Sequence, residues 1–151
     1  MDEVIVFLAS KLHVAIVVIA IITFLLSTKK QRMALALTAM TALPLSYLLG
    51  KIASFFYYTE RPFSELGIAS LVPHIADNGF PSEHTLYAMV IAAVVFSVRK
   101  NWGLLLIVLA ILVGISRVLA GVHHYIDVVG SVVIAVITTY VVTILLRQLQ
   151  K

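Results

Sequence analysis

A histidine and an aspartate near residue 125 have the spacing of a catalytic pair. His123 and Asp127 stand four positions apart, which places them on one face of a helix. A carboxylate at that spacing can hold one imidazole nitrogen and leave the other free as a nucleophile or base. Taken alone, the spacing also fits a capping or interfacial pair, so the assignment depends on the groups around it.

The residues from Pro81 to His84 predict a second polar group at the start of a helix. Pro81 ends an extended segment, and Ser82 is suited to the N-cap position. Backbone N–H groups at a helix N-terminus bind anions, so a phosphate there is expected to contact Ser82 and His84. Plain capping explains Ser82 and Glu83 but leaves the histidine without a role.

Two arginines add positively charged guanidinium groups to these candidate site residues. Arg61 precedes a proline and Arg117 follows Ser116, and a planar guanidinium suits the oxygens of a phosphate. An ion pair between Arg117 and Asp127 that only joins two helices is the structural alternative. Together with two histidines and a helix N-terminus, the arginines predict a phosphate-binding site.

The composition predicts that these residues belong to a membrane protein. The 151-residue chain is 62% hydrophobic and 12% charged, with a mean hydropathy of +1.08, against roughly 45 to 50% apolar and 25% charged in soluble domains. These values exclude a soluble enzyme, a disordered chain and a disulfide-rich secreted scaffold. The net charge of +4 comes without a nucleic-acid recognition module, so no nucleic-acid partner is expected.

Five apolar runs predict an all-α, polytopic membrane bundle formed by one domain over residues 1–151. A helix satisfies its own backbone hydrogen bonds in hydrocarbon, and the runs lack the alternation of a membrane barrel. The third and fourth runs are expected to be short, so their outer ends lie below the membrane surface. The runs are Val4–Ser27, Met33–Tyr58, Ser82–Val98, Trp102–Ile115 and Tyr125–Leu146.

The charges divide between the two sides of this bundle. All seven acidic residues lie on or near the side that holds the N-terminus, the loop 59–81 and the joint 116–124. The basic residues of the other side are Lys29, Lys30, Arg32, Arg99, Lys100, Arg147 and Lys151. The Lys/Arg bias predicts a cytoplasmic C-terminus, with the N-terminus and the polar site outside the cell membrane.

Three ordered blocks resemble the motifs of the phosphatidic acid phosphatase type 2 superfamily. Its third motif is matched by Ser116-Arg117, His123 and Asp127. Its second motif is similar to the segment 81–84, and the end of its first to Arg61-Pro62. The stretches 60–63, 73–77, 80–84 and 121–125 also look like the bacitracin-resistance type of undecaprenyl-diphosphatase, in which an acidic residue precedes the second-motif histidine.

The resemblance implies a role for each matched residue. His123 attacks phosphorus and forms a phosphohistidine, and Asp127 orients it. His84 protonates the leaving oxygen and then activates water. The phosphoryl oxygens are held by Arg61, Ser82, Ser116 and Arg117, and no metal or other cofactor is implied.

The chain departs from the family pattern at one motif position and in its number of spans. The first motif has a lysine seven residues before its Arg-Pro, where this chain has Ser54. Lys51 shares a helix face with Ser54 and is a candidate phosphate ligand, with a snorkelling or structural lysine as the alternative. Members usually have six spans, and the expected missing span is N-terminal, which leaves every motif on the outer side.

Four further polar residues have less support. His13 is expected to be a packed or interfacial histidine and not a catalyst. His74 and His124 are candidates to line the substrate pocket, and Glu83 is a candidate to tune the neighbouring histidine or to select the substrate.

These features predict a lipid phosphatase that converts a polyprenyl (undecaprenyl) diphosphate to the monophosphate for carrier-lipid recycling. The alternative within this class acts on phosphatidate or phosphatidylglycerophosphate. A different class is a non-enzymatic lipid-phosphate or metal-binding protein, since four side chains are possible zinc ligands: His84, His123, His124 and Asp127. The sequence indicates no particular oligomeric state.

Overall fold

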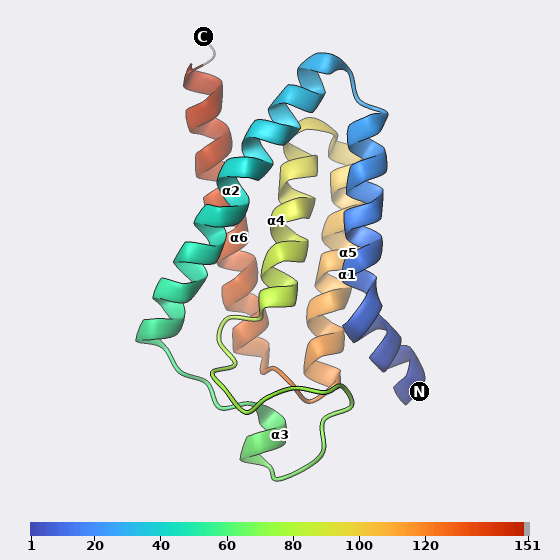
Figure 1. The fold of residues 1–151 in the computed structure, drawn as a ribbon, viewed down its shortest axis with the longest axis vertical. Coiled ribbons are helices and arrows are strands. Elements are labelled where there is room, and N and C mark those ends of the chain that lie inside the picture. The colour runs from blue at the N-terminus through green and yellow to red at the C-terminus, as the bar shows by residue number, and fades with distance from the viewer. Residues whose placement is uncertain (150–151) are drawn as a thin grey trace.

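The structure, a computed structural model, describes residues 1–149 and is entirely helical over that range. Five long helices and one single-turn helix form a bundle (Figure 1). The predicted class, an all-α membrane bundle, is confirmed. The helices are α1 (Asp2–Leu25), α2 (Lys29–Phe56), α3 (Pro62–Glu65), α4 (Glu83–Val98), α5 (Lys100–Leu119) and α6 (Tyr125–Leu149).

Each of the five predicted apolar runs forms a helix, but one expected boundary is wrong. Four helices (α1, α2, α5 and α6) are long and apolar enough to cross a membrane, and α4 is a shorter apolar helix of 16 residues, as expected. The fourth run is not short, because α5 has 20 residues and includes Ser116 and Arg117. A charged residue usually ends a membrane span, but Arg117 is only 3% exposed. The helix therefore continues past it inside the protein.

Helix α4 forms the centre of the bundle. It contacts α1, α2, α5 and α6, and Figure 1 shows it between the surrounding helices. Half of its residues are buried, as expected for a helix that is hydrophobic all round. The turn from α4 into α5 depends on Gly103, because a Cβ there would collide with the backbone of Phe96.

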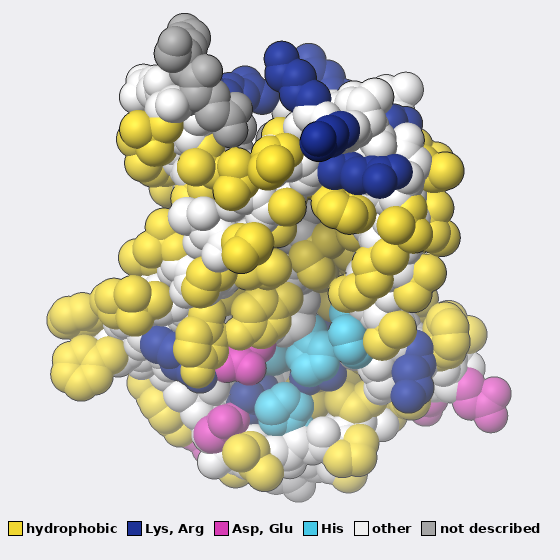
Figure 2. Space-filling view, turned by 45° about the horizontal axis from the view of Figure 1, so that its top comes forward, with side chains coloured by type: hydrophobic (Ala, Val, Ile, Leu, Met, Phe, Trp, Pro, Cys, Tyr) yellow, Lys and Arg dark blue, Asp and Glu magenta, His cyan; other side chains and the backbone are white. Residues whose placement is uncertain are grey.

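The outer faces of the bundle are covered by large apolar side chains. Val14 on α1, Met40 on α2, Val108 on α5 and Val133 on α6 are each about half exposed or more, and hydrophobic atoms cover most of the bundle's side in Figure 2. Such a surface is expected where lipid tails replace water. The chain is therefore a multi-pass membrane protein.

The two ends of the bundle differ in structure. The N-terminus, α3 and the long loop lie at one end in Figure 1, and the described C-terminal end of the chain lies at the other. The loop 59–81 contains the single-turn helix α3, which begins at Pro62, since proline fits the first helical position. The polar residues of the predicted site lie at this loop end.

Candidate active site

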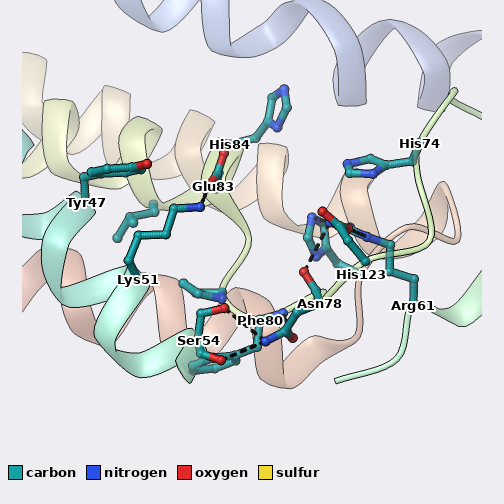
Figure 3. A pocket seen from close by; sticks show the side chains of 14 residues that line it. Tyr47, Lys51, Ser54, Arg61, His74, Asn78, Phe80, Glu83, His84 and His123 are labelled. Atoms are coloured by element: carbon teal, nitrogen blue, oxygen red, sulfur yellow. Dashed lines mark hydrogen bonds and ion pairs between the residues drawn. The ribbon is translucent and has the colours of Figure 1, made fainter. Parts of the chain in front are cut away.

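A cavity of about 300 Å³ lies at the loop end, among α2, α4 and the loops that precede α4 and α6. Its lining includes Arg61, His74, His84 and His123. Figure 3 shows these side chains projecting from separate segments, and Figure 2 shows histidines and acids together in a hollow of the surface. The cavity therefore brings together residues from all three predicted motifs.

The turn between α5 and α6 positions His123 over Asp127. Gly121 takes a positive φ of 75° just after α5, a conformation that favours glycine. His123 follows, and its Nδ1 lies 3.3 Å from Oδ2 of Asp127, which also accepts the backbone N–H of His124 at 2.8 Å. Both side chains are buried. The carboxylate thus favours the tautomer with the proton on Nδ1 and the lone pair on Nε2.

The surroundings of His123 favour its neutral form. Burial lowers the pKa of its imidazole, and the positive charges of Arg61 and Arg117 lower that pKa further. The hydrogen bond with Asp127 acts in the opposite direction without outweighing burial. A neutral ring with a free Nε2 is the form of histidine that can attack phosphorus.

Arg61 is held beside the free nitrogen of His123. Its Nε donates to Oδ1 of Asp77 at 2.7 Å, and its Nη1 donates to the backbone carbonyl of Val122 at 2.8 Å. The same Nη1 lies 3.4 Å from Nε2 of His123. Arg61 is 5% exposed, so its guanidinium is fixed next to the nucleophile candidate.

Arg117 has donors without partners. It extends from the last turn of α5 and donates from Nη1 to the carbonyl of Ala9 at 3.4 Å. Its Nε and Nη2 and the Oδ1 of Asp127 are buried without hydrogen-bond partners among residues 1–149. No ion pair joins Arg117 to Asp127 in that range, where Asp127 pairs with His123. Buried polar groups without partners call for an explanation such as a bound ion. Arg117 does not line the cavity, so its contact with phosphate remains a prediction.

The two serines of the predicted phosphate site bond within the protein. Ser82 is the N-cap residue of α4 but makes no side-chain cap bond, and its hydroxyl accepts from Thr85 at 3.0 Å. The hydroxyl of Ser116 donates to the carbonyl of Val113 at 2.7 Å. Neither serine lines the cavity, so their contact with phosphate remains a prediction.

His84 lines the cavity, and in Figure 3 its ring is directed toward the helix above it. Its ring centroid lies 4.9 Å from that of His13 on α1, with the planes at 85°. Sequence reasoning expected His13 to be a packing residue and did not foresee this neighbour. The two positions are 71 residues apart, and no local pattern connects them.

Lys51 and Glu83 form an ion pair at the rim of the cavity. Nζ of Lys51 lies 2.8 Å from Oε1 of Glu83 and 5.2 Å from the ring centre of Tyr47. Both charged side chains are about half exposed, and both line the cavity. The ammonium therefore borders the site from the helix that carries the first motif, one turn before Ser54.

Asn78 is a site residue that sequence reasoning missed. Its side-chain oxygen accepts the backbone N–H groups of Thr59 and Phe80, each at 3.0 Å. Its Nδ2 donates to the carbonyl and hydroxyl of Ser54, each at 3.0 Å, and to the carbonyl of Tyr57 at 2.9 Å. Asparagine commonly bonds to loop backbone, so the Asn-Gly pair was the available signal.

The two remaining histidines point to different places. His74 lines the cavity, and its ring centroid lies 6.0 Å from that of His123. Burial lowers the pKa of His74, and the nearby arginines lower it further. His124 turns away, with Nε2 at 3.1 Å from Oε2 of Glu65, and its side chain does not line the cavity.

The possible zinc ligands do not converge. His124 pairs with Glu65, and the ring of His84 is directed toward α1. Over residues 1–149, no three His, Cys, Asp or Glu side chains are grouped so as to hold a metal ion. The geometry thus offers the metal-binding alternative no ligand set.

Comparison with known proteins finds similarity over most of the chain. The sequence pattern of the PAP2 superfamily matches residues 34–151. The chain is 32% identical over 139 residues to the bacitracin transport permease protein BcrC of Bacillus licheniformis, covering 91% of this chain and 68% of that protein. It is 31% identical over 140 residues to the undecaprenyl-diphosphatase BcrC of Bacillus subtilis, covering 91% and 70%.

A solved structure shares the fold as well. The PAP2-type phosphatidylglycerolphosphate phosphatase of Bacillus subtilis is similar over 97% of this chain and 77% of its own, with a TM-score of 0.67 and 27% sequence identity.

Proposed function

The chain belongs to the PAP2 superfamily, and on that premise we propose that it hydrolyses a polyprenyl diphosphate to the monophosphate and phosphate. One observation carries the proposal. The buried His123 has its Nδ1 held by Asp127 and its Nε2 beside Arg61, at the wall of a cavity that faces the loop end of a membrane bundle. This is the arrangement that a nucleophilic histidine requires.

The first half of the reaction transfers the terminal phosphoryl group to the protein. Nε2 of His123 attacks the terminal phosphorus, the P–N bond forms, and the bond from phosphorus to the bridging oxygen breaks. His84 gives its proton to that oxygen, and the lipid monophosphate leaves. Arg61 and Arg117 stabilise the charge on the equatorial oxygens, which is the main requirement of phosphoryl transfer.

The second half releases phosphate. His84, now neutral, takes a proton from water as the water oxygen attacks the phosphohistidine. The P–N bond breaks, its electron pair returns to Nε2 of His123, and phosphate departs. Asp127 holds Nδ1 throughout and stabilises the positive ring of the phosphohistidine, so the protein returns to its starting protonation state without a metal.

A diphosphate substrate is supported by the cation at the cavity rim. A lipid tail stays in the bilayer while its headgroup enters the cavity from the loop end. Lys51 pairs with Glu83 and lines the same cavity as Arg61. We propose that Lys51 binds the phosphate group that stays on the lipid after hydrolysis. When substrate binds, the ammonium of Lys51 leaves Glu83 and pairs with this phosphate.

The charges of the bundle support a location of the site on the outer side of the membrane. Basic residues gather at the end opposite the cavity, seen at the top of Figure 2. Lys29 and Lys30 begin α2, and Arg99 and Lys100 connect α4 to α5. The positive-inside rule supports a cytoplasmic location for this end, with the cavity and the N-terminus outside.

A second candidate substrate is phosphatidylglycerophosphate, because a structural relative with this fold is a phosphatase of that lipid. The test measures phosphate release from undecaprenyl diphosphate, phosphatidylglycerophosphate and phosphatidate by detergent-purified protein in EDTA, beside His123→Ala. We expect the wild type to prefer the diphosphate and the variant to be inactive. Equal activity in the variant, or activity only with added metal, contradicts the proposed mechanism. A preference for either monoester corrects the substrate.

A further inference from the structure

His84 has no acidic partner in the described structure. A histidine that donates a proton is usually held by a carboxylate, but no carboxylate in residues 1–149 pairs with His84. The acids around the site are engaged elsewhere: Asp127 with His123, Asp77 with Arg61, Glu83 with Lys51 and Glu65 with His124. Another group must stabilise the protonated ring of His84.

The need for such a group is increased by the charge of Arg117. A positive imidazolium beside a buried guanidinium is disfavoured, and a donor shielded from water is unfavourable without an acceptor. His84 acts as proton donor in the first half of the proposed reaction, so its protonated form needs an acceptor close to its ring.

The nearest candidate acceptor is His13. Its ring stands edge-on to that of His84, with a centroid distance of 4.9 Å. Its Nδ1 is buried and has no hydrogen-bond partner among the described residues. Both histidines also line a second cavity, of about 280 Å³, between α1 and α4. Packing on an apolar helix does not call for a buried nitrogen of this kind.

We propose that His13 is a positioning residue for His84: a neutral imidazole that accepts a hydrogen bond from protonated His84 and holds it ready to donate. The inference rests on the proposed function of His84 as the acid. The contact requires only a side-chain rotation, because the two rings are already adjacent.

The proton inventory of the reaction does not change. His84 gives its proton to the bridging oxygen and regains one from the attacking water, while His13 stays neutral in both halves. Its effect is to raise the fraction of His84 that carries a proton at a given pH. Removal of His13 should therefore shift the pH dependence of the reaction as well as lower its rate.

Other titratable and charged groups surround the two rings. On α4 they are Glu83, which is bound to Lys51 of α2, and Tyr87; α5 contributes Arg117, the loops contribute His74 and His123, and α1 itself contributes Lys11. The one acid among them, Glu83, is paired with Lys51 in this structure.

The test compares His13→Phe, His13→Gln and the control Val14→Ala, whose residue lies on the exposed face of the same helix. We expect His13→Phe to lower kcat by about tenfold at unchanged KM and to move the alkaline limb of the pH profile about one unit lower. His13→Gln should recover part of the rate, because its amide oxygen accepts a hydrogen bond. A His13→Phe profile that matches Val14→Ala contradicts the proposal.

A second measurement separates this inference from the proposed function. The protonation of the His84 ring is followed by NMR of detergent-solubilised protein with ¹⁵N-labelled histidine, in wild type and His13→Phe. Loss of the proton from His84 at lower pH in the variant supports the contact even if the wild type hydrolyses no diphosphate. An unchanged titration of His84 overturns the inference whether or not the enzyme is active.

Discussion

At the scale of single residues, Asp127 determines which nitrogen of His123 is free. Its Oδ2 binds Nδ1 of His123 and the backbone N–H of His124. An amide at this position can present its NH₂ group to Nδ1 and reverse the tautomer. We therefore expect Asp127→Asn to lower kcat by about a thousandfold or more, measured as phosphate release. Circular dichroism should show the same helix content, and near-normal turnover would remove Asp127 from the mechanism.

The lowered pKa of His123 makes a prediction about pH. An ordinary histidine is half protonated at a pH of about 6.5. Burial and two arginines lower the pKa of His123. The neutral nucleophile thus persists below that pH. We expect the acid limb of kcat/KM to have its midpoint below pH 6.5, measured from pH 4 to 9 at constant ionic strength. A midpoint above pH 6.5 would contradict the neutral nucleophile.

Lys51 provides a test of substrate selection. If its ammonium binds the retained phosphate, Lys51→Ala should raise KM for the diphosphate by about tenfold, since one charge-assisted contact is worth roughly 1.5 kcal/mol or more. KM for a monoester should change little. Lys100→Ala, at the opposite end of the bundle, is the matched control. Equal effects on both substrates would make Lys51 structural.

The spacing of residues in the sequence predicted part of the site. It could not predict contacts between segments that are far apart in the chain. His123 and Asp127 could be paired because a helix fixes the relation of positions four apart. His13 and Asn78 could not be assigned, because their partners lie on other helices or across a loop. The contact of His124 with Glu65 of α3 could not be predicted for the same reason.

At the scale of elements, the loop before α4 depends on one side chain. The side chain of Asn78 makes five hydrogen bonds. They join the end of α2 to the loop segment that precedes α4. Asn78 is partly buried, and leaving the backbone groups that it binds without partners costs about 1 to 3 kcal/mol where they are shielded from water. We expect Asn78→Ala to lower the thermal midpoint and to reduce kcat, because Arg61 and Asp77 lie on the segments it connects.

The matched control for Asn78 is Asn101→Ala, which alters an exposed asparagine near the start of α5. Thermal unfolding in detergent is followed together with phosphate release. A melting midpoint for Asn78→Ala equal to that of the control would show that the loop is held by other contacts.

Element boundaries were predictable where hydrophobicity alone decides them. The short α4 and the long α2 follow from apolar runs, whereas α5 extends through Ser116 and Arg117 because the protein, not lipid, surrounds that turn. The sequence alone does not show whether a charged side chain lies in solvent, in lipid or in the interior of the bundle. The end of a membrane helix next to a buried site is therefore the least predictable boundary.

At the scale of the whole molecule, the bundle separates its charges by end. The cavity, its histidines and the loop acids lie at one end, and the basic residues that begin α2 and connect α4 to α5 lie at the other. Lys151, which sequence reasoning assigned to the basic end, lies outside the described residues. The described basic residues suffice to predict the orientation.

Single cysteines test this orientation, because the chain has none of its own. Ile68→Cys introduces an exposed thiol in the loop at the cavity end, and Lys30→Cys introduces one at the basic end. A membrane-impermeant maleimide added to intact cells should label the first and spare the second, which should react only after the cells are opened. The reverse pattern would place the cavity in the cytoplasm. A lipid diphosphate presented on the outer face could then not reach His123 without first crossing the bilayer.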